Sequence, residues 1–320
     1  MELRGINAIF IKQYIEFKRN LGYAFKYTHN LGMFDRFTVA YGANTVGLTM
    51  ELAEKWAEKR PNESGVTRYK RVSDVINFSK YLNHLGYDSY IPRQVKKYRT
   101  TFTPYIFSHE NLKAFFAAAD TQEVYGDSTI KYILPVVFRL IYGCGLRVNE
   151  ALSLKCGDVR LEDKYIVIRE PKNGHDRMLP MSDSLTEICA LYRLRYLGRH
   201  SKEDYFFTQK TMRRYAADTL YSWFRKILWK AGISHGGKGL GPRVHDLRHS
   251  FSVHSLESMS RSGLDLYYSL PILSKYLGHQ SLEATDAYVR LTFEMYPELI
   301  REVDNLCAYV FPEVVIHETD

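Results

Sequence analysis

The sequence predicts a mainly α-helical protein with one small β-hairpin, organised as an N-terminal helical domain followed by a mixed α/β domain. Three observations carry this prediction. Apolar residues recur every three or four positions along most of the 320 residues, strand character is confined to residues 165–181, and the excess positive charge lies in the first hundred residues. With 45% hydrophobic residues the chain can bury a sizeable core, which excludes a disordered protein.

The first domain, residues 1–98, is expected to be a compact bundle of four or five helices. Apolar positions repeat at helical spacing over residues 6–21 and again over residues 66–85. Between them, Thr49 is a suitable N-cap for a helix over residues 50–59, which has acidic residues in its first turn and basic residues at its end.

Charge is distributed unevenly along the chain. Of the 44 basic and 36 acidic residues, the first hundred positions hold 17 and 9, a net charge of +8, which leaves 27 of each sign for the remainder. Concentrated positive charge suits a module that grips a polyanion. The alternative, an ordinary solvated basic surface with no special partner, remains open on charge alone.

A linker over residues 99–107 separates this domain from a second one over residues 108–320. The stretch around the linker mixes proline, threonine and basic residues without helical period. Ser108 is then the expected N-cap of a further helix. Residues 129–154 are again helical in pattern, with an internal proline and two interrupting glycines.

The strand signal comes from YIVIRE (165–170) and RMLPM (177–181). They flank the turn PKNGH, whose Asn173-Gly174 pair is favoured in two-residue hairpin turns. Helical patterns resume after the hairpin, broken by a loop at residues 236–242. That loop, GGKGLGP, lacks the spacing of a phosphate-binding P-loop, so we reject a nucleotide-binding interpretation.

Several protein classes are excluded by what the sequence lacks. The longest apolar stretch, residues 132–138, is far shorter than a membrane span, and the N-terminus has no signal-peptide pattern. The four cysteines show no C-x-x-C spacing, so neither a disulfide framework nor a zinc site is indicated. We therefore expect a cytoplasmic protein with reduced thiols, no membrane association and no cofactor.

One set of polar residues points to chemistry on a phosphodiester. Guanidiniums can hold the non-bridging oxygens of a phosphate, a phenol can attack phosphorus, and a lysine can protonate the departing oxygen. Such a set cuts a strand without a metal. The candidates are Arg147, Lys172, His245, Arg248, His279 and Tyr288, with Glu150 as a residue that orients Arg147 or a neighbouring base.

Local spacing supports some of these positions, although each has an ordinary explanation when taken singly. His245 and Arg248 are three residues apart, so on a helix they share a face and can touch one phosphate. His245 and His249 have the i, i+4 spacing of a metal pair, but the fixed cation at Arg248 and the lack of a nearby acidic ligand disfavour a metal. Arg147 follows two glycines at a helix start, where the backbone can approach an anion.

Tyr288 needs activation if it is to act as a nucleophile. An unperturbed tyrosine titrates at about pH 10, so at neutral pH it is mostly protonated. We expect two arginines and a histidine nearby to favour its phenolate and to stabilise charge on pentacoordinate phosphorus.

The order of these residues resembles that of a known family, the tyrosine recombinases, also called the phage integrase family. GCGLRVNEAL is similar to the family's first arginine box, PKNGHDRMLP to its lysine hairpin, HDLRHSF to its His-x-x-Arg box, and LGHQSLEATDAY to its Gly-His and nucleophile boxes. The resemblance covers nearly the full chain, and the boxes are jointly very specific. The N-terminal region is similar to the family's core-binding domain in size and position.

The resemblance implies a role for each candidate. The two arginines would clamp the scissile phosphate, His279 would hydrogen-bond it, and His245 would assist proton transfer. Tyr288 would attack phosphorus to give a 3′-phosphotyrosyl link, while Lys172 would protonate the 5′-oxygen.

The resemblance also implies the partners. Members of the family act on double-stranded DNA at specific recombination sites, and four protomers exchange strands between two duplexes through a Holliday junction without ATP or a metal. Because helical sequence begins by Ile6, we expect a compact Xer-like or transposon-borne enzyme rather than a larger lambda-type integrase with an arm-binding domain. A helix over residues 293–309 is expected to contact a neighbouring protomer.

Two alternatives share parts of this inventory. A type IB-like topoisomerase or a telomere resolvase would use the same cleavage chemistry with a different outcome. A catalytically silent DNA-binding regulator would share the scaffold, but the intact set of catalytic residue types speaks against it.

Overall fold

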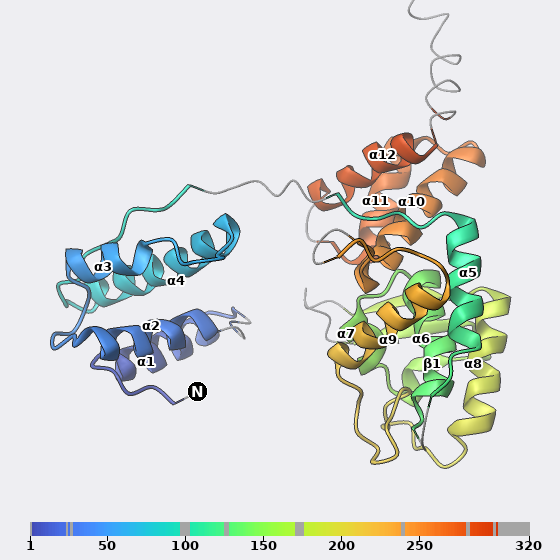
Figure 1. Ribbon diagram of the computed structural model, residues 1–320, viewed down its shortest axis with the longest axis horizontal. Helices are drawn as coiled ribbons and strands as arrows, with labels where there is room; N and C mark the ends of the chain where they lie inside the picture. Colours follow the sequence, from blue (N-terminus) through green and yellow to red (C-terminus); the bar gives the residue numbers. More distant parts are fainter. Residues whose placement is uncertain are drawn as a thin grey trace, which may run out of the picture. The chain divides into compact units, whose positions relative to one another are not determined.

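The computed structural model describes residues 2–23, 25, 28–96, 103–124, 128–169, 176–237, 241–279, 282–296 and 299. The chain divides into two compact units, Met1–Phe102 and Thr103–Asp320, and both are predominantly helical (Figure 1). The predicted class, mainly α with a small sheet, is confirmed.

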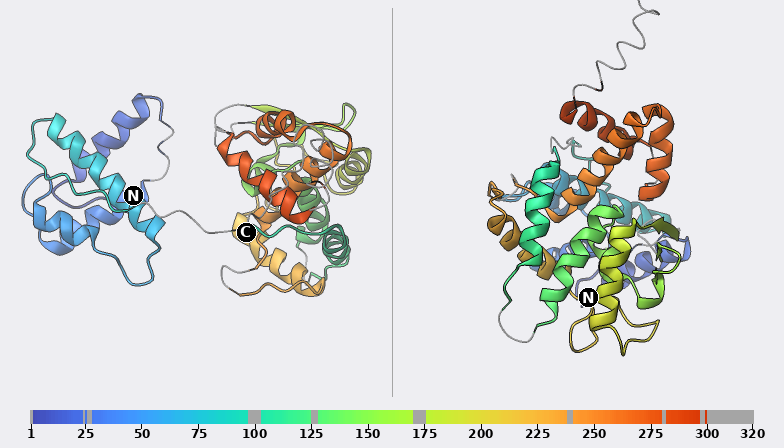
Figure 2. Two further views of the ribbon diagram at one scale, coloured as in Figure 1. Left: turned by 90° about the horizontal axis from the view of Figure 1, so that it is seen from above. Right: turned by 90° about the vertical axis from the view of Figure 1, so that its right-hand side faces the viewer.

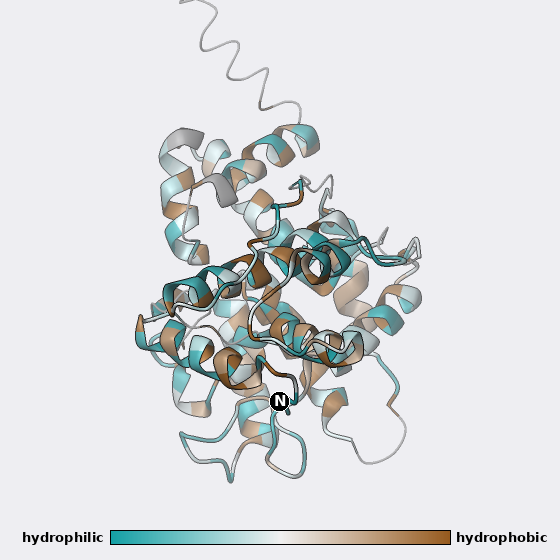
Figure 3. Cartoon of the chain, turned by 90° about the vertical axis from the view of Figure 1, so that its left-hand side faces the viewer, coloured by the Kyte–Doolittle hydropathy of each residue, from teal (hydrophilic) through white to brown (hydrophobic). Residues whose placement is uncertain are grey.

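The first unit is a bundle whose described residues form α1 (Ala8–Asn20), α2 (His29–Tyr41), α3 (Met50–Ala57) and α4 (Gly65–His84). Figure 3 shows hydrophobic and hydrophilic residues alternating along these helices, as expected when each helix buries one face. The buried faces meet in an aromatic core, where the Phe34 ring centroid lies 5.2 Å from that of Trp56 and 6.3 Å from that of Phe78.

Two N-caps predicted from the sequence are confirmed, one in each unit. The Thr49 hydroxyl accepts a hydrogen bond from the Leu52 backbone N–H at 3.2 Å, at the start of α3. The Ser108 hydroxyl accepts one from the Asn111 N–H at 3.1 Å, at the start of the first helix of the second unit. Each hydroxyl satisfies a backbone donor that the first helical turn leaves unpaired.

The second unit contains α5 (His109–Asp120), α6 (Ile130–Gly143), α7 (Val148–Ser153), α8 (Asp183–Tyr196), α9 (Ala217–Lys230), α10 (Val244–Arg261), α11 (Leu266–Leu277) and α12 (Glu283–Met295). Helix α10 packs against α6, α9, α11 and α12. Figures 1 and 2 show α11 and α12 together at one end of this unit and α8 at the other. The core includes Phe107, whose backbone N–H donates to the Ser250 hydroxyl at 2.8 Å. The last residue of the expected linker is therefore part of this core.

The sheet of the second unit has three antiparallel strands in the order β1 (Val159–Arg160), β2 (Tyr165–Ile168) and β3 (Arg177–Pro180). Ile166 pairs with Leu179 across β2 and β3, and both side chains are buried. The two strands of the predicted hairpin are thus confirmed, while its turn at Asn173-Gly174 lies outside the described residues. Strand β1 was not predicted, because two residues carry no readable alternation of apolar and polar positions.

None of the helices in the described part of the chain combines the length and hydropathy needed to cross a bilayer.

Candidate active site

The candidate residues converge from separate segments of the second unit. Arg147 is the N-cap residue of α7, and Glu150 lies in the first turn of that helix. His245 and Arg248 lie in the first two turns of α10. His279 follows α11, and Tyr288 lies in the middle of α12. Lys172, the predicted general acid, lies outside the described residues.

Glu150 is the carboxylate at which the arginines meet. It accepts hydrogen bonds from the Arg147 backbone N–H at 2.9 Å and from Arg147 Nη1 at 2.7 Å. It also accepts one from Arg177 Nη2 at 2.8 Å, and Arg248 Nη1 lies 3.7 Å from its Oε2. Burial alone would raise the pKa of Glu150, but the Arg177 and Arg147 hydrogen bonds and charges hold it below its ordinary value. Three cations thus surround one carboxylate, which leaves the site positively charged.

Arg248 is the most deeply placed of these cations, with 1% of its side chain exposed. Its Nη1 donates to the Gly145 carbonyl and its Nη2 to the Leu277 carbonyl, both at 2.7 Å. The same Nη2 lies 3.2 Å from His279 Nε2. Burial and the neighbouring Arg147 lower the pKa of Arg248 to about 10, so it remains a cation at neutral pH. Arg248 therefore contacts the turn before α7, the last residue of α11 and His279.

The three histidines near the arginines are neutral at pH 7. Burial and the Arg248 guanidinium lower the pKa of His279 to about 4, and its Nδ1 lies 2.8 Å from the Thr285 hydroxyl. Desolvation lowers the pKa of His249 to about 3. Desolvation and Arg248 also lower the pKa of His245; because that side chain is exposed, we attribute more of its shift to the nearby cations.

Tyr288 is 4% exposed, and its hydroxyl lies 2.8 Å from His249 Nδ1. Its ring is nearly parallel to that of His279, with centroids 6.2 Å apart. Burial raises the pKa of Tyr288, and the opposing effects of Arg248, Ser252 and other groups do not cancel it. Arg248 and Arg147 do favour the phenolate, as expected, but desolvation outweighs their attraction and leaves the net pKa above its ordinary value.

Gly145, two residues before Arg147, is required by its backbone conformation and by its packing. Gly145 has a φ of +58°, and a Cβ there would lie 2.6 Å from the Phe251 ring. Glycine is thus required for a left-handed turn and for close packing on α10. The Gly145 carbonyl accepts a hydrogen bond from Arg248, and the approach of this backbone to a bound phosphate stays a prediction.

Two residues of the cluster were missed as site residues from the sequence. Arg177, at the start of β3, contacts Glu150 through both terminal nitrogens. His249 was considered only as half of a metal pair with His245, whose ring centroid lies 4.7 Å away. Within the described residues no group of three or more His, Cys, Asp and Glu side chains could hold a metal. The i, i+4 spacing on α10 was the available signal for His249, and nothing in the sequence pointed to Arg177.

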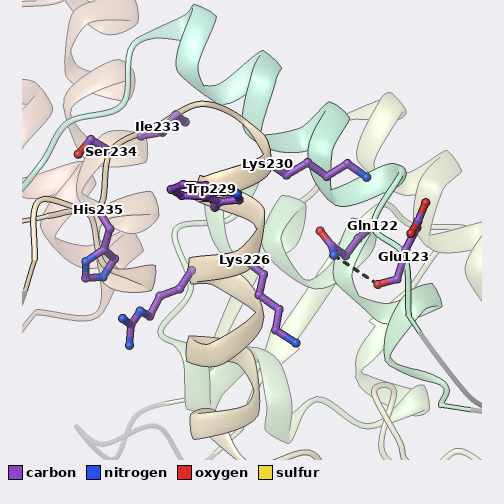
Figure 4. A pocket seen from close by; sticks show the side chains of 9 residues that line it. Gln122, Glu123, Lys226, Trp229, Lys230, Ile233, Ser234 and His235 are labelled. Carbon is purple, nitrogen blue, oxygen red and sulfur yellow. Dashed lines mark hydrogen bonds between the residues drawn. The ribbon is translucent and has the colours of Figure 1, made fainter.

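A separate hollow of about 840 Å³ lies beside α9 and contains none of the candidate residues. Figure 4 shows Lys226, Trp229 and Lys230 projecting from α9 around it, with Gln122 and Glu123 on the facing side. Trp229 is 87% exposed, and Lys226 Nζ lies 4.1 Å from the Trp223 ring centroid. This surface is basic and aromatic, but the cluster around Glu150 is where the candidate chemistry resides.

Comparison with known proteins gives relatives over most of the chain. The putative integrase/recombinase y4rB of Sinorhizobium fredii is 27% identical over 309 residues, which cover 92% of this chain and 96% of that protein. The tyrosine recombinase XerA of Pyrococcus horikoshii is 35% identical over 170 residues, or 52% of this chain and 53% of XerA. This chain thus spans about half the length of that XerA relative.

Solved structures share the fold. XerH recombinase bound to a palindromic difH substrate aligns with a TM-score of 0.62 at 21% identity, covering 93% of this chain and 83% of that one. A lambda integrase (75-356) dimer bound to a COC′ core site aligns with a TM-score of 0.60 at 13% identity, covering 88% and 94%.

The family model described as the Phage integrase family matches residues 106–295, more than half of the sequence. The matched region spans α5 to α12 and includes every candidate residue. The chain therefore belongs to the phage integrase family, the enzymes also called tyrosine recombinases.

Proposed function

We propose that this protein is a site-specific DNA recombinase that cleaves and rejoins strands through a covalent bond to Tyr288. The observation that carries the proposal is the convergence of Arg147, Arg248 and His279 beside this buried tyrosine, from segments 147–288 of the sequence. Such a cluster supplies a nucleophile and the cations for a phosphate in one place.

The charge balance of the cluster suits a phosphodiester. Three guanidiniums surround the single negative charge of Glu150, so net positive charge remains for an incoming phosphate. Further negative charge develops on the oxygens of pentacoordinate phosphorus during attack, and preorganised cations stabilise it. In this proposal Arg147 and Arg248 bind the non-bridging oxygens, and His279 hydrogen-bonds the same phosphate. His245, exposed at the edge of the cluster, assists proton transfer.

Attack by the Tyr288 oxygen forms a 3′-phosphotyrosyl link and expels the 5′-oxygen. We assign the proton for that oxygen to Lys172, by its place in the lysine hairpin. The phosphotyrosyl link retains the energy of the broken bond, so a 5′-hydroxyl from another strand can displace the tyrosine without ATP.

Binding of the duplex is assigned to both domains. Residues 1–98 carry most of the net positive charge and form the proposed DNA clamp, residues 99–107 the linker, and residues 108–320 the catalytic domain. The cations and exposed Trp229 on α9 extend the basic surface of the catalytic domain. XerH, solved bound to a palindromic difH substrate, and lambda integrase (residues 75-356), solved bound to DNA, share the fold.

Strand exchange sets the proposed stoichiometry. Two duplexes contain four strands, and each protomer supplies one Tyr288, so a full exchange through a Holliday junction requires four copies. The segment 293–309, of which residues beyond Tyr296 lie almost wholly outside the described part, is the proposed contact between protomers.

A covalent-capture experiment tests the proposal. The protein is incubated with a library of randomised duplexes, each nicked so that cleavage releases a short strand and traps the adduct. SDS-resistant complexes are then sequenced. The wild type should enrich a defined site, and Tyr288→Phe should bind that site without forming an adduct. Tyr276→Phe, in the neighbouring helix α11, is the control and should form adducts normally.

The same site then discriminates the outcomes. Exchange between two labelled duplexes indicates a recombinase, whereas relaxation of a supercoiled plasmid without exchange indicates a topoisomerase. An adduct that persisted in Tyr288→Phe would refute the proposed nucleophile.

A further inference from the structure

His249 has no role in the mechanism as proposed so far, yet it is the residue whose nitrogen lies at the nucleophile. Its Nδ1 lies 2.8 Å from the Tyr288 oxygen, and the ring centroids are 5.6 Å apart. We infer that His249 is a further catalytic residue, which accepts the phenolic proton of Tyr288 as the tyrosine attacks phosphorus and returns it on rejoining. The inference rests on the proposed function.

The burial of the tyrosine creates the need for such a group. With 4% of Tyr288 exposed, its hydroxyl has little access to bulk water, so a departing proton requires an acceptor in the protein. Ser252, which also interacts with this hydroxyl, is not basic, and its own hydroxyl donates to the Arg248 carbonyl at 2.9 Å. The imidazole of His249 is the basic group in contact.

The packing of two helices holds this pair in place. His249 lies on α10 and Tyr288 on α12, and these helices pack closely along each other. His249 is also one turn from His245, at the exposed edge of the cluster. Proton acceptor and phosphate-binding groups are therefore carried by the same rigid helix.

Burial and the charges around His249 keep its imidazole unprotonated, which leaves it able to take up a proton but weakens it as a base. Burial comes first among the causes that lower its pKa to about 3, followed by His245, Arg248, His279 and Arg243. It is therefore neutral before DNA binds. A phosphate bound at the arginines offsets part of this positive field, which strengthens the imidazole as a base at the moment when the tyrosine gives up its proton.

Protons and bonds balance over the cycle. In cleavage, the Tyr288 oxygen bonds to phosphorus and its proton moves to His249 Nδ1. The bond from phosphorus to the 5′-oxygen breaks as Lys172, the proposed general acid, gives that oxygen a proton. In rejoining, a 5′-hydroxyl gives its proton to Lys172 and attacks phosphorus, the bond from phosphorus to the Tyr288 oxygen breaks, and His249 returns its proton to the departing phenolate. The imidazole ends neutral, as it began.

The free protein provides the first test, which needs no DNA. Acceptance at Nδ1 requires the neutral tautomer with its proton on Nε2. Nitrogen-15 NMR of histidine-labelled protein reports the tautomer, with the His249 signals assigned by their loss in His249→Asn. An Nε2–H tautomer is expected. A proton found on Nδ1 would make the tyrosine oxygen the acceptor and would overturn the inference.

The second test measures single-turnover cleavage of the nicked duplex selected by covalent capture. Asparagine at 249 retains an amide near the Nδ1 position but takes no proton, so His249→Asn should slow adduct formation by about 100-fold or more. The matched control is His254→Asn, because His254 lies on the same helix and its Nδ1 contacts the Tyr142 hydroxyl at 2.9 Å. That variant should cleave at the wild-type rate.

Two changes in chemistry separate proton acceptance from a structural role. Replacement of Tyr288 by 3,5-difluorotyrosine makes the phenol more acidic, so it depends less on a base. With this tyrosine, the ratio of the cleavage rate with His249 to that with Asn at position 249 should be about tenfold smaller. A 5′-bridging phosphorothiolate, whose leaving group needs no proton, should leave the defect unchanged. A wild-type rate in His249→Asn, no effect of the fluorinated tyrosine, or rescue by the phosphorothiolate would each overturn the inference. Adduct formation by the wild type establishes the proposed function separately, so these failures concern His249 alone.

Discussion

Substitution of Glu150 by glutamine removes the negative charge that Arg147 and Arg177 share while preserving the size of the side chain. Glu150 is buried, with 7% of its side chain exposed, so the guanidiniums would face one another without compensation and with little water to screen them. Breaking a buried ion pair on one side costs about 3 to 5 kcal/mol. For a domain of 150 to 250 residues, each kcal/mol lowers the melting temperature by about 2 to 4 °C, so a drop of roughly 10 °C is expected.

Scanning calorimetry of the full chain measures this drop, with the exposed Glu187→Gln as control. The dependence on pH gives a second signature. Because the folded protein holds the pKa of Glu150 below its ordinary value, this carboxylate contributes stability above about pH 4.3, and that contribution disappears as pH falls through the folded value. The difference in melting temperature between the wild type and Glu150→Gln should therefore become smaller as the pH is lowered. Added sulfate can bind beside the guanidiniums that have lost the carboxylate. It should therefore raise the melting temperature of the variant more than that of the wild type. A variant that melts within 1 °C of the wild type, at about the precision of the method, would refute the reasoning.

Three further predictions follow from the same geometry. Gly145→Ala places a side chain on a left-handed residue and against the Phe251 ring, so denaturant titrations should show the second unit destabilised by about 2 to 4 kcal/mol. The control is Gly263→Ala, which is also left-handed but has no atom within 4 Å of the added Cβ, and which should cost about 1 to 2 kcal/mol. Arg225→Ala on α9 should reduce the salt slope of DNA affinity by about one, and an unchanged slope would exclude α9 from the DNA contact. Thr285→Val removes the hydroxyl at His279 and should slow single-turnover cleavage about fivefold, the equivalent of about 1 kcal/mol, with DNA binding unchanged.

Local sequence signals were sufficient to predict most of the helices and the hairpin strands. Thr49 and Ser108 cap helices because each hydroxyl accepts a hydrogen bond from the backbone N–H three residues further on. Such a short spacing can be recognised from the sequence. The candidate arginines, histidines and tyrosine were chosen for their distinctive order along the chain, and the structure places Arg147, Arg248, His279 and Tyr288 in one cluster.

What the sequence could not provide depends on contacts between elements. Arg177 joins the cluster only because β3 brings it to Glu150 on α7, 27 residues away in sequence. His249 meets Tyr288 because α10 packs on α12, and the spacing of histidines alone suggested a metal. The raised pKa of Tyr288 is a property of burial, which neighbouring residue types do not reveal.

The burial of Tyr288 affects how the protein would behave toward DNA when it is not engaged in a reaction. Under the proposed function, a phenol that is protonated and buried between α10 and α12 would have little opportunity to attack DNA that is not bound at the site. The packing of α10 on α12 would then protect the cell from unwanted strand breaks by the resting protein.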